Sequence, residues 1–147
     1  MRRISWDDVS RELTEEEYQR LLRLRDGLRR FLDWSSREAM TAGLTPAQHQ
    51  LLLAIRGHQP GTPSMKDVAE HLLTRHHSTV QLVDRAERAG LVERHADEDD
   101  HRVVRLTLTS LGARLLESLA ASHLEELERL GEHLDLLALA AGNPGGP

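Results

Sequence analysis

MKDVAEHLLTRHHSTVQLVDRAERAG, residues 65–90, is the stretch that decides the fold. In its first nine residues, apolar side chains recur at a spacing of three and four, which predicts a short amphipathic helix. The residues in this pattern are Met65, Val68, Ala69 and Leu72. Ser64 and Asp67 provide the S-x-x-D pattern of a capping box, so the helix is expected to begin just after Ser64.

A second helix is predicted over residues 75–89, ending at Gly90, which favours the left-handed turn that closes many helices. One face carries an apolar stripe, and the opposite face is polar. The stripe consists of Thr79, Val80, Val83 and Ala86, and the polar face of His77, Ser78, Gln81, Arg85 and Arg88.

Two β-rich segments follow, residues 91–94 and 103–108, on either side of the polar run 95–102. This pattern predicts a β-hairpin with the polar run at its tip. Two helices joined by a short turn and followed by a hairpin make a winged helix-turn-helix, whose second helix faces the major groove of DNA. On spacing alone, a small α+β domain with a merely solvated polar face is an equal alternative.

Two motifs extend this interpretation. VDRAERAGLVER, residues 83–94, follows the pattern Val-Asp-Arg-x-Glu-x-x-Gly-Leu-Val-x-Arg, and DHR at 100–102 is followed by LTSLG at 108–112. With these motifs, residues 14–137 resemble the MarR family of bacterial transcriptional regulators. The resemblance implies a mainly α fold (α+β) in which a winged helix-turn-helix with a small β-hairpin wing is flanked by terminal dimerisation helices.

The resemblance also implies a function. A MarR-like homodimer binds a pseudo-palindromic operator in double-stranded DNA, usually as a repressor, and is released by a small, often aromatic or phenolic, effector. The wing arginine, Arg102, would enter the minor groove, with Asp100 holding it. The predicted DNA-binding residues are Arg75, His76, His77, Ser78, Gln81, Arg85, Asp100 and Arg102.

The sequence departs from the family at two positions. Arg75 stands where the family commonly has Ser or Asp, so we expect Thr74 to cap the second helix one residue earlier. Ala86 replaces a more usual leucine, which predicts looser packing there.

The flanking segments read as helices. Thr14 and Glu17 form a capping box before a leucine-rich stripe that ends near Gly43, and residues 45–48 repeat the start signal before a helix expected to be largely buried. The breaker-rich run 57–63 is expected to be a surface loop, and a last leucine-striped helix, bent or broken at Gly131, is expected after Thr109. The expected organisation is an N-terminal arm and dimerisation helix (1–43), a DNA-binding domain (44–109), C-terminal dimerisation helices (110–141) and a disordered tail (142–147).

An effector crevice is predicted between the dimerisation helices and the winged domain. Phe31 and Trp34 share a helix face, and four other side chains are placed in the same crevice; the alternative is that all six are ordinary core. The six residues are Phe31, Trp34, Met40, His49, Leu53 and Leu115.

Composition excludes several classes of protein. The 147 residues carry a net charge of −5 and no cysteine, which rules out a disulfide frame, a thiolate zinc site and a thiol redox switch. No run of eighteen apolar residues and no signal-peptide core occur, so a cytoplasmic protein with no membrane contact is expected.

The charge balance argues against DNA binding. Residues 65–105 carry seven lysine or arginine residues and nine acidic ones, whereas nucleic-acid-binding domains usually present a basic patch. A winged-helix module that binds protein and leaves DNA alone therefore stays open as an alternative.

An enzyme is not expected, because the sequence lacks a Gly-rich phosphate loop, an H-E-x-x-H motif and a G-x-S-x-G elbow. No cofactor and no metal are expected either, since the adjacent His76 and His77 diverge by about 100° on a helix. A metal-responsive regulator that uses other histidines, such as His71 or His101, remains a further alternative. His123 and His133 are predicted to be solvent-exposed.

Overall fold

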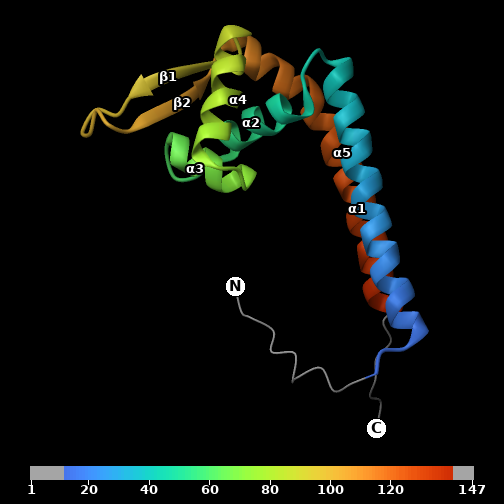
Figure 1. Ribbon diagram of the computed structural model, residues 1–147. Coiled ribbons are helices and arrows are strands. Elements are labelled where there is room, and N and C mark those ends of the chain that lie inside the picture. The colour runs from blue at the N-terminus through green and yellow to red at the C-terminus, as the bar shows by residue number, and fades with distance from the viewer. Residues whose placement is uncertain (1–11, 141–147) are drawn as a thin grey trace.

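The chain folds into a helical head that carries a β-hairpin and a long two-helix arm that extends from it (Figure 1). This computed structural model describes residues 12–140, with side chains up to Leu134. Three predicted features lie outside the described residues: the segment 1–11 before the first helix, the disordered tail at 142–147 and the side chain of Leu137. The elements are α1 (Glu15–Thr41), α2 (Pro46–Gly57), α3 (Met65–Leu72), α4 (His76–Arg88), β1 (Val92–Ala96), β2 (Val104–Leu108) and α5 (Ser110–Ala140).

Capping boxes begin three of the helices, as the sequence predicts. In each box, the hydroxyl of the capping residue accepts a hydrogen bond from the backbone N–H three residues later, and that later side chain accepts one in return. The pairs are Thr14 with Glu17, Thr45 with Gln48, and Ser64 with Asp67.

The core lies where α2, α3 and α4 meet the hairpin. Its fully buried side chains come from all four elements: Leu51, Leu52, Val68, Thr79, Val83, Val92 and Leu106. Ala39 of α1 and Leu119 of α5 are also buried, so the arm joins the head through the same core. The predicted fold class, mainly α with a small β wing, is confirmed.

The wing is antiparallel, with Val92 opposite Leu108 and Ala96 opposite Val104. A single bridge between Ser64 and Arg105 adds the segment before α3 to the hairpin edge. The first strand begins one residue later than predicted and continues into the predicted tip, because Ala96 still pairs with Val104.

The two glycines of the sequence motifs, Gly90 and Gly112, are required by the backbone at the junction between α4, the wing and α5. Gly90 adopts φ +73°, and a Cβ on Gly112 would overlap the carbonyl oxygen of Leu91. Thr109 completes the junction, because its hydroxyl donates to the carbonyl of Gly90 at 2.6 Å and accepts from the N–H of Gly112 at 3.0 Å. Leucine, threonine and glycine at 108–112 are therefore packing requirements of the fold.

Some local predictions were wrong. Thr74 does not cap α4: Arg75 is the N-cap residue without a side-chain cap, and the Thr74 hydroxyl instead contacts the Thr79 hydroxyl at 2.7 Å. Gly131 does not break the last helix, which continues from Ser110 to Ala140. Leu53, on a helix expected to be largely buried, is 56% exposed.

Candidate nucleic-acid interface

The helix α4 presents a continuous polar face. The residues of the buried face are Thr79, Leu82, Val83 and Ala86, which pack against the core; Leu82 replaces the half-buried Val80 of the predicted stripe. Six of the predicted DNA-binding residues lie on the other side and are exposed: Arg75, His76, His77, Ser78, Gln81 and Arg85. Ala86 is fully buried in the core.

At the wing tip, Asp100 holds Arg102. The Arg102 side chain donates from Nε to Oδ1 at 3.0 Å and from Nη2 to Oδ2 at 3.1 Å, and its backbone N–H donates to Oδ1 at 3.1 Å. These hydrogen bonds from Arg102 lower the pKa of Asp100. The Arg102 side chain is nevertheless 90% exposed, so this pair contributes little to stability and leaves an oriented guanidinium facing solvent.

A second carboxylate organises the turn behind it. Asp97 accepts the backbone N–H groups of Asp99 at 3.1 Å and Asp100 at 3.0 Å, and it accepts Nε of Arg105 at 2.8 Å. The Arg105 hydrogen bond is the main cause that lowers the pKa of Asp97. The tip is therefore held in one shape by two ionised aspartates.

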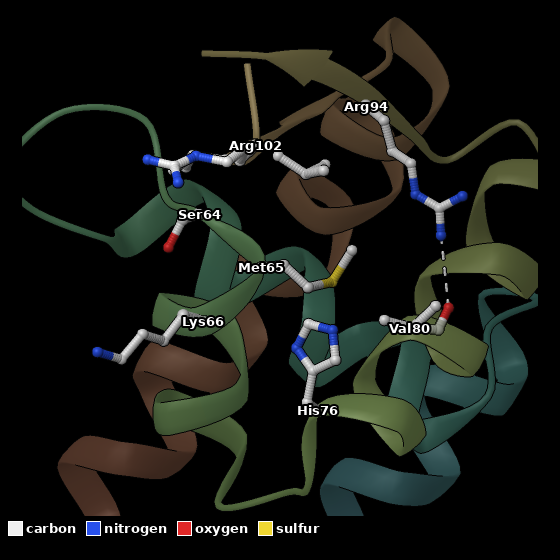
Figure 2. A pocket seen from close by; sticks show the side chains of 9 residues that line it. Ser64, Met65, Lys66, His76, Val80, Arg94 and Arg102 are labelled. Atoms are coloured by element: carbon white, nitrogen blue, oxygen red, sulfur yellow. Dashed lines mark hydrogen bonds between the residues drawn. The ribbon is translucent and has the colours of Figure 1, made fainter. Parts of the chain in front are cut away.

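A groove separates α3 and α4 from the wing (Figure 2). It encloses about 520 Å³ and has an apolar floor that includes Met65, Val80 and Val104. In Figure 2, the Lys66 and Arg102 side chains extend toward one rim of this groove, opposite Arg94. A basic rim thus connects α3 with the wing tip.

Ion pairs with arginines engage five of the nine acidic residues in the segment 65–105. Arg94 of β1 pairs with Asp84 and with Glu87 of α4, and Arg105 pairs with Asp97 and lies 3.9 Å from Asp67. These acids, together with Asp100, are thus engaged by arginines of the wing. Within the segment 65–105, four cations form no ion pair with a described residue, and all belong to α3 or the α4 segment: Lys66, Arg75, Arg85 and Arg88.

The same pairs give a physical meaning to the 83–94 motif. Asp84, Glu87 and Arg94 link α4 to β1, and Arg94 Nη2 also approaches the carbonyl oxygen of Val80 at 3.5 Å. Sequence reasoning used these residues as a family signature and missed their role as a brace. The alternation of the strand, which places Arg94 on the face opposite Glu93, was the available signal.

Three of the six residues predicted for the effector crevice, Phe31, Trp34 and His49, lie in one aromatic cluster with His123. The rings of Phe31 and Trp34 lie 6.1 Å apart, and the His123 ring lies 4.7 Å from both Trp34 and His49. Leu115 is half-buried against the core. Met40 and Leu53 are each more than half exposed in the single chain, so the structure does not bring these two into the aromatic cluster.

The predicted exposure of His123 was wrong. Its ring is partly buried, with Nδ1 2.9 Å from the carbonyl oxygen of Leu119 and Nε2 2.8 Å from the Ser35 hydroxyl. His123 follows Leu116 and Leu119 at a spacing of three and four, so the helical stripe itself indicated its position. His133 is exposed, as predicted.

His49 is 6% exposed, and burial lowers its pKa, with a further contribution from His123. A small cavity of about 130 Å³ lies beside it, lined by residues of α1 and α2 that include Leu32, Ser35 and Gln50. Typical small-molecule sites have volumes of about 300–1,000 Å³. Binding of an aromatic acid here therefore requires an opening between α1 and α2 or a second chain.

Two further observations concern the alternatives. Among the described residues, no group of three or more histidine, aspartate or glutamate side chains converges as metal ligands, and His71 contacts His58 instead of the wing. Within residues 12–140, no helix has the length and apolar character needed to cross a membrane.

The helix pair α3–α4 and its two-stranded wing define a winged helix-turn-helix protein. Residues 42–103 match the model of the MarR family. An HTH-type transcriptional regulator of Bacillus subtilis, YfiV, is 29% identical, and the match covers 72% of each protein. The chain is thus similar to transcriptional regulators of the MarR family, in sequence over residues 42–103 and in fold over most of its length.

Solved structures share the fold. AbsC, a MarR family transcriptional regulator from Streptomyces coelicolor, is 23% identical over 88% of this chain and 90% of that protein, with a TM-score of 0.72. The MepR–DNA complex of S. aureus is 21% identical over 82% of this chain and 85% of MepR, with a TM-score of 0.64.

Proposed function

We propose that the chain represses transcription by binding a pseudo-palindromic operator as a homodimer and that a small effector releases it. The observation that carries this proposal is the polar face of α4 beside an exposed Arg102 that Asp100 orients. A similarly folded relative, MepR, has been solved in complex with DNA. The net-acidic segment 65–105 still offers four cations without an acidic partner for contact with phosphates, on α3 and in the α4 segment.

The DNA contacts divide by chemistry. His77, Ser78 and Gln81 lie on the outer face of α4 and would reach base edges in the major groove, with Arg75 and His76 at the start of the helix. Arg85, one turn further along, would meet the phosphate backbone. Arg102 would enter the minor groove, whose negative potential attracts a guanidinium, while Asp100 keeps it extended from the tip.

The homodimer follows from the arm. The leucines on α1 and α5 exceed what these two helices bury against each other, and several stay more than half exposed: Leu21, Leu22, Leu32, Leu124 and Leu127. An apolar surface of this kind marks an association site. A second copy would cover it, which assigns dimerisation to segments 1–43 and 110–141 and DNA binding to segment 44–109.

The effector is proposed to be a small aromatic or phenolic anion. Trp34 and Phe31 supply ring faces, and His49 and His123 supply polar ring nitrogens where α1, α2 and α5 meet. This junction connects the arm to the head, so a ligand that favours one arrangement of the two changes the spacing of the recognition helices. DNA affinity then falls by the ratio of the ligand affinities for the two arrangements.

Selection of bound sequences from a random DNA pool tests the DNA-binding proposal. We expect enrichment of an inverted repeat whose half-sites lie about one DNA turn apart, because two recognition helices related by a two-fold axis read the same groove face. Enrichment of no sequence, or of a single unrepeated half-site, would contradict the proposal.

Tryptophan fluorescence tests the effector site separately. Salicylate-like compounds should quench Trp34 and release operator DNA, and Trp34→Leu should abolish the quenching, leaving only Trp6 as a fluorophore. Ligand-induced DNA release that persists unchanged in both Trp34→Leu and His49→Ala would place the effector elsewhere.

A further inference from the structure

Two histidines face each other on the side of the head where α2 ends and α3 ends. His58, the C-cap residue of α2, places its Nδ1 2.9 Å from Nε2 of His71, in the last turn of α3. The two rings are nearly perpendicular, with centroids 5.2 Å apart. Neither residue belongs to the motifs that define the recognition helix or the wing.

A carboxylate supports this pair from behind. Asp67 Oδ2 lies 3.6 Å from the other ring nitrogen of His58, Nε2. Asp67 is itself fixed, because it accepts the backbone N–H of Ser64 at 2.9 Å in the capping box that begins α3. A carboxylate beside one imidazole nitrogen favours the tautomer that carries the proton there, so the lone pair of His58 Nδ1 accepts a hydrogen bond from Nε2–H of His71. A metal ion would replace that proton, and the neutral His71 ring would carry its proton on Nδ1 instead.

The geometry points to a site for a divalent transition-metal ion, which we propose is bound by Nδ1 of His58 and Nε2 of His71, with Asp67 as the positioning residue. The carboxylate–imidazole–metal arrangement is the usual one for histidine ligands in proteins. The His71 side chain is exposed and opens the site to solvent, while the His58 side chain is only 14% exposed and is held in place.

Imidazole nitrogens suit several divalent ions, and the affinity of a nitrogen site rises along the first transition series to Ni²⁺ and Cu²⁺. A site with only two histidine ligands therefore favours these two ions. Because no third histidine or acid converges here within the described residues, water completes the coordination.

Occupancy would tie the end of α2 to the end of α3. Since α3 is the first helix of the helix-turn-helix and Asp67 also lies 3.9 Å from Arg105 of β2, the ion would stiffen the support of the recognition helix. This inference is independent of the proposed operator binding, because the ligands do not include any predicted DNA-contacting residue.

Calorimetric titration of the untagged, chelator-treated full chain with Cu²⁺ or Ni²⁺ tests the site. We expect one ion per chain in the wild type, loss of that binding in His71→Ala and retention in the matched control His133→Ala, whose exposed histidine lies on α5. Circular dichroism establishes that both variants are folded. Unchanged binding in His71→Ala, or no binding of either ion to the wild type, overturns the proposal.

A positioning role for Asp67 has its own readout. Asp67→Asn keeps an oxygen that accepts the Ser64 hydrogen bond but removes the negative charge behind His58, so metal affinity should fall by about 10–100-fold while the two-nitrogen pattern in the Cu²⁺ electron paramagnetic resonance spectrum stays. Wild-type affinity in Asp67→Asn overturns this role. Ni²⁺ should also raise the melting temperature of the wild type and not that of His71→Ala.

Discussion

The head and the arm of this molecule differ in how fully they bury their large apolar side chains. In the head, large apolar side chains such as Leu51 and Leu106 are fully buried, and the charges of the wing are matched by ion pairs such as Arg94 with Asp84. In the arm, Leu22 of α1 and Leu124 of α5 stay 58% and 61% exposed. The head thus buries most of its large apolar side chains within one chain, whereas the arm exposes leucines that the proposed dimer would cover.

The largest expected effect comes from charging the arm. Leu124→Glu should convert the dimer to a monomer at micromolar concentration, because an ionised carboxylate would have to be buried in the interface. Light scattering measures the mass. The matched control is Leu73→Asn, which removes a 93% exposed leucine from the head and should leave the dimer intact. A monomeric wild type would contradict the comparison outright.

The junction that joins head to arm should tolerate no side chain at Gly112. Gly112→Ala should destabilise the fold by about 1–3 kcal/mol, because its Cβ would overlap the Leu91 carbonyl oxygen. Gly131→Ala, in the same helix with nothing within 4 Å, should instead stabilise it by about 0.5–1 kcal/mol. Urea unfolding measures both changes, and equal effects would show that the junction is not tightly packed.

The buried His49 predicts a pH dependence. Because burial and His123 lower its pKa in the folded state from the ordinary value of 6.5, the unfolded chain binds the proton more readily. The contribution of the neutral His49 ring to the free energy of unfolding should therefore be fully present above pH 6.5. It should fall as the pH drops below that value toward the pKa of the folded state. Denaturant midpoints measured across this range should vary less in His49→Gln, and identical curves would contradict burial of the neutral ring.

The smallest effect concerns the turn between α3 and α4. Leu73 adopts φ +53° and is almost fully exposed, so Leu73→Gly should relieve strain without loss of packing and stabilise the fold by up to about 1 kcal/mol. Thermal melting checks this. A lower melting temperature would mean that the leucine makes a contact, for example in the dimer.

Most of the fold could be predicted from the sequence because its signals are local. Capping boxes at Thr14, Thr45 and Ser64 each place a helix start within four residues of the signal, and the left-handed Gly90 marks the end of α4. Where one local rule met a competing contact, the prediction failed: Thr74 was expected to cap α4, but its hydroxyl turns to Thr79.

The site depends on contacts between distant segments, and these could be predicted less well. The aromatic cluster joins Trp34 of α1 to His123 of α5, and the neighbouring Ser35 forms a hydrogen bond with His123 across 88 positions of the chain. Likewise, a count of charges in residues 65–105 could not reveal which charges are paired, for example that Asp84, Asp97 and Asp100 each contact an arginine of the wing.

The central claim is that α4 and the wing contact DNA together, and the salt dependence of operator affinity tests it most directly. Arg102→Ala should weaken binding to every sequence and reduce the slope of log affinity against log salt by about 1, while Gln81→Ala should relax preference at one base pair by about 1–3 kcal/mol and leave the slope unchanged. Fluorescence anisotropy with the selected operator measures both variants. If Arg102→Ala binds like the wild type at all salt concentrations, the wing does not contact DNA and the account is wrong.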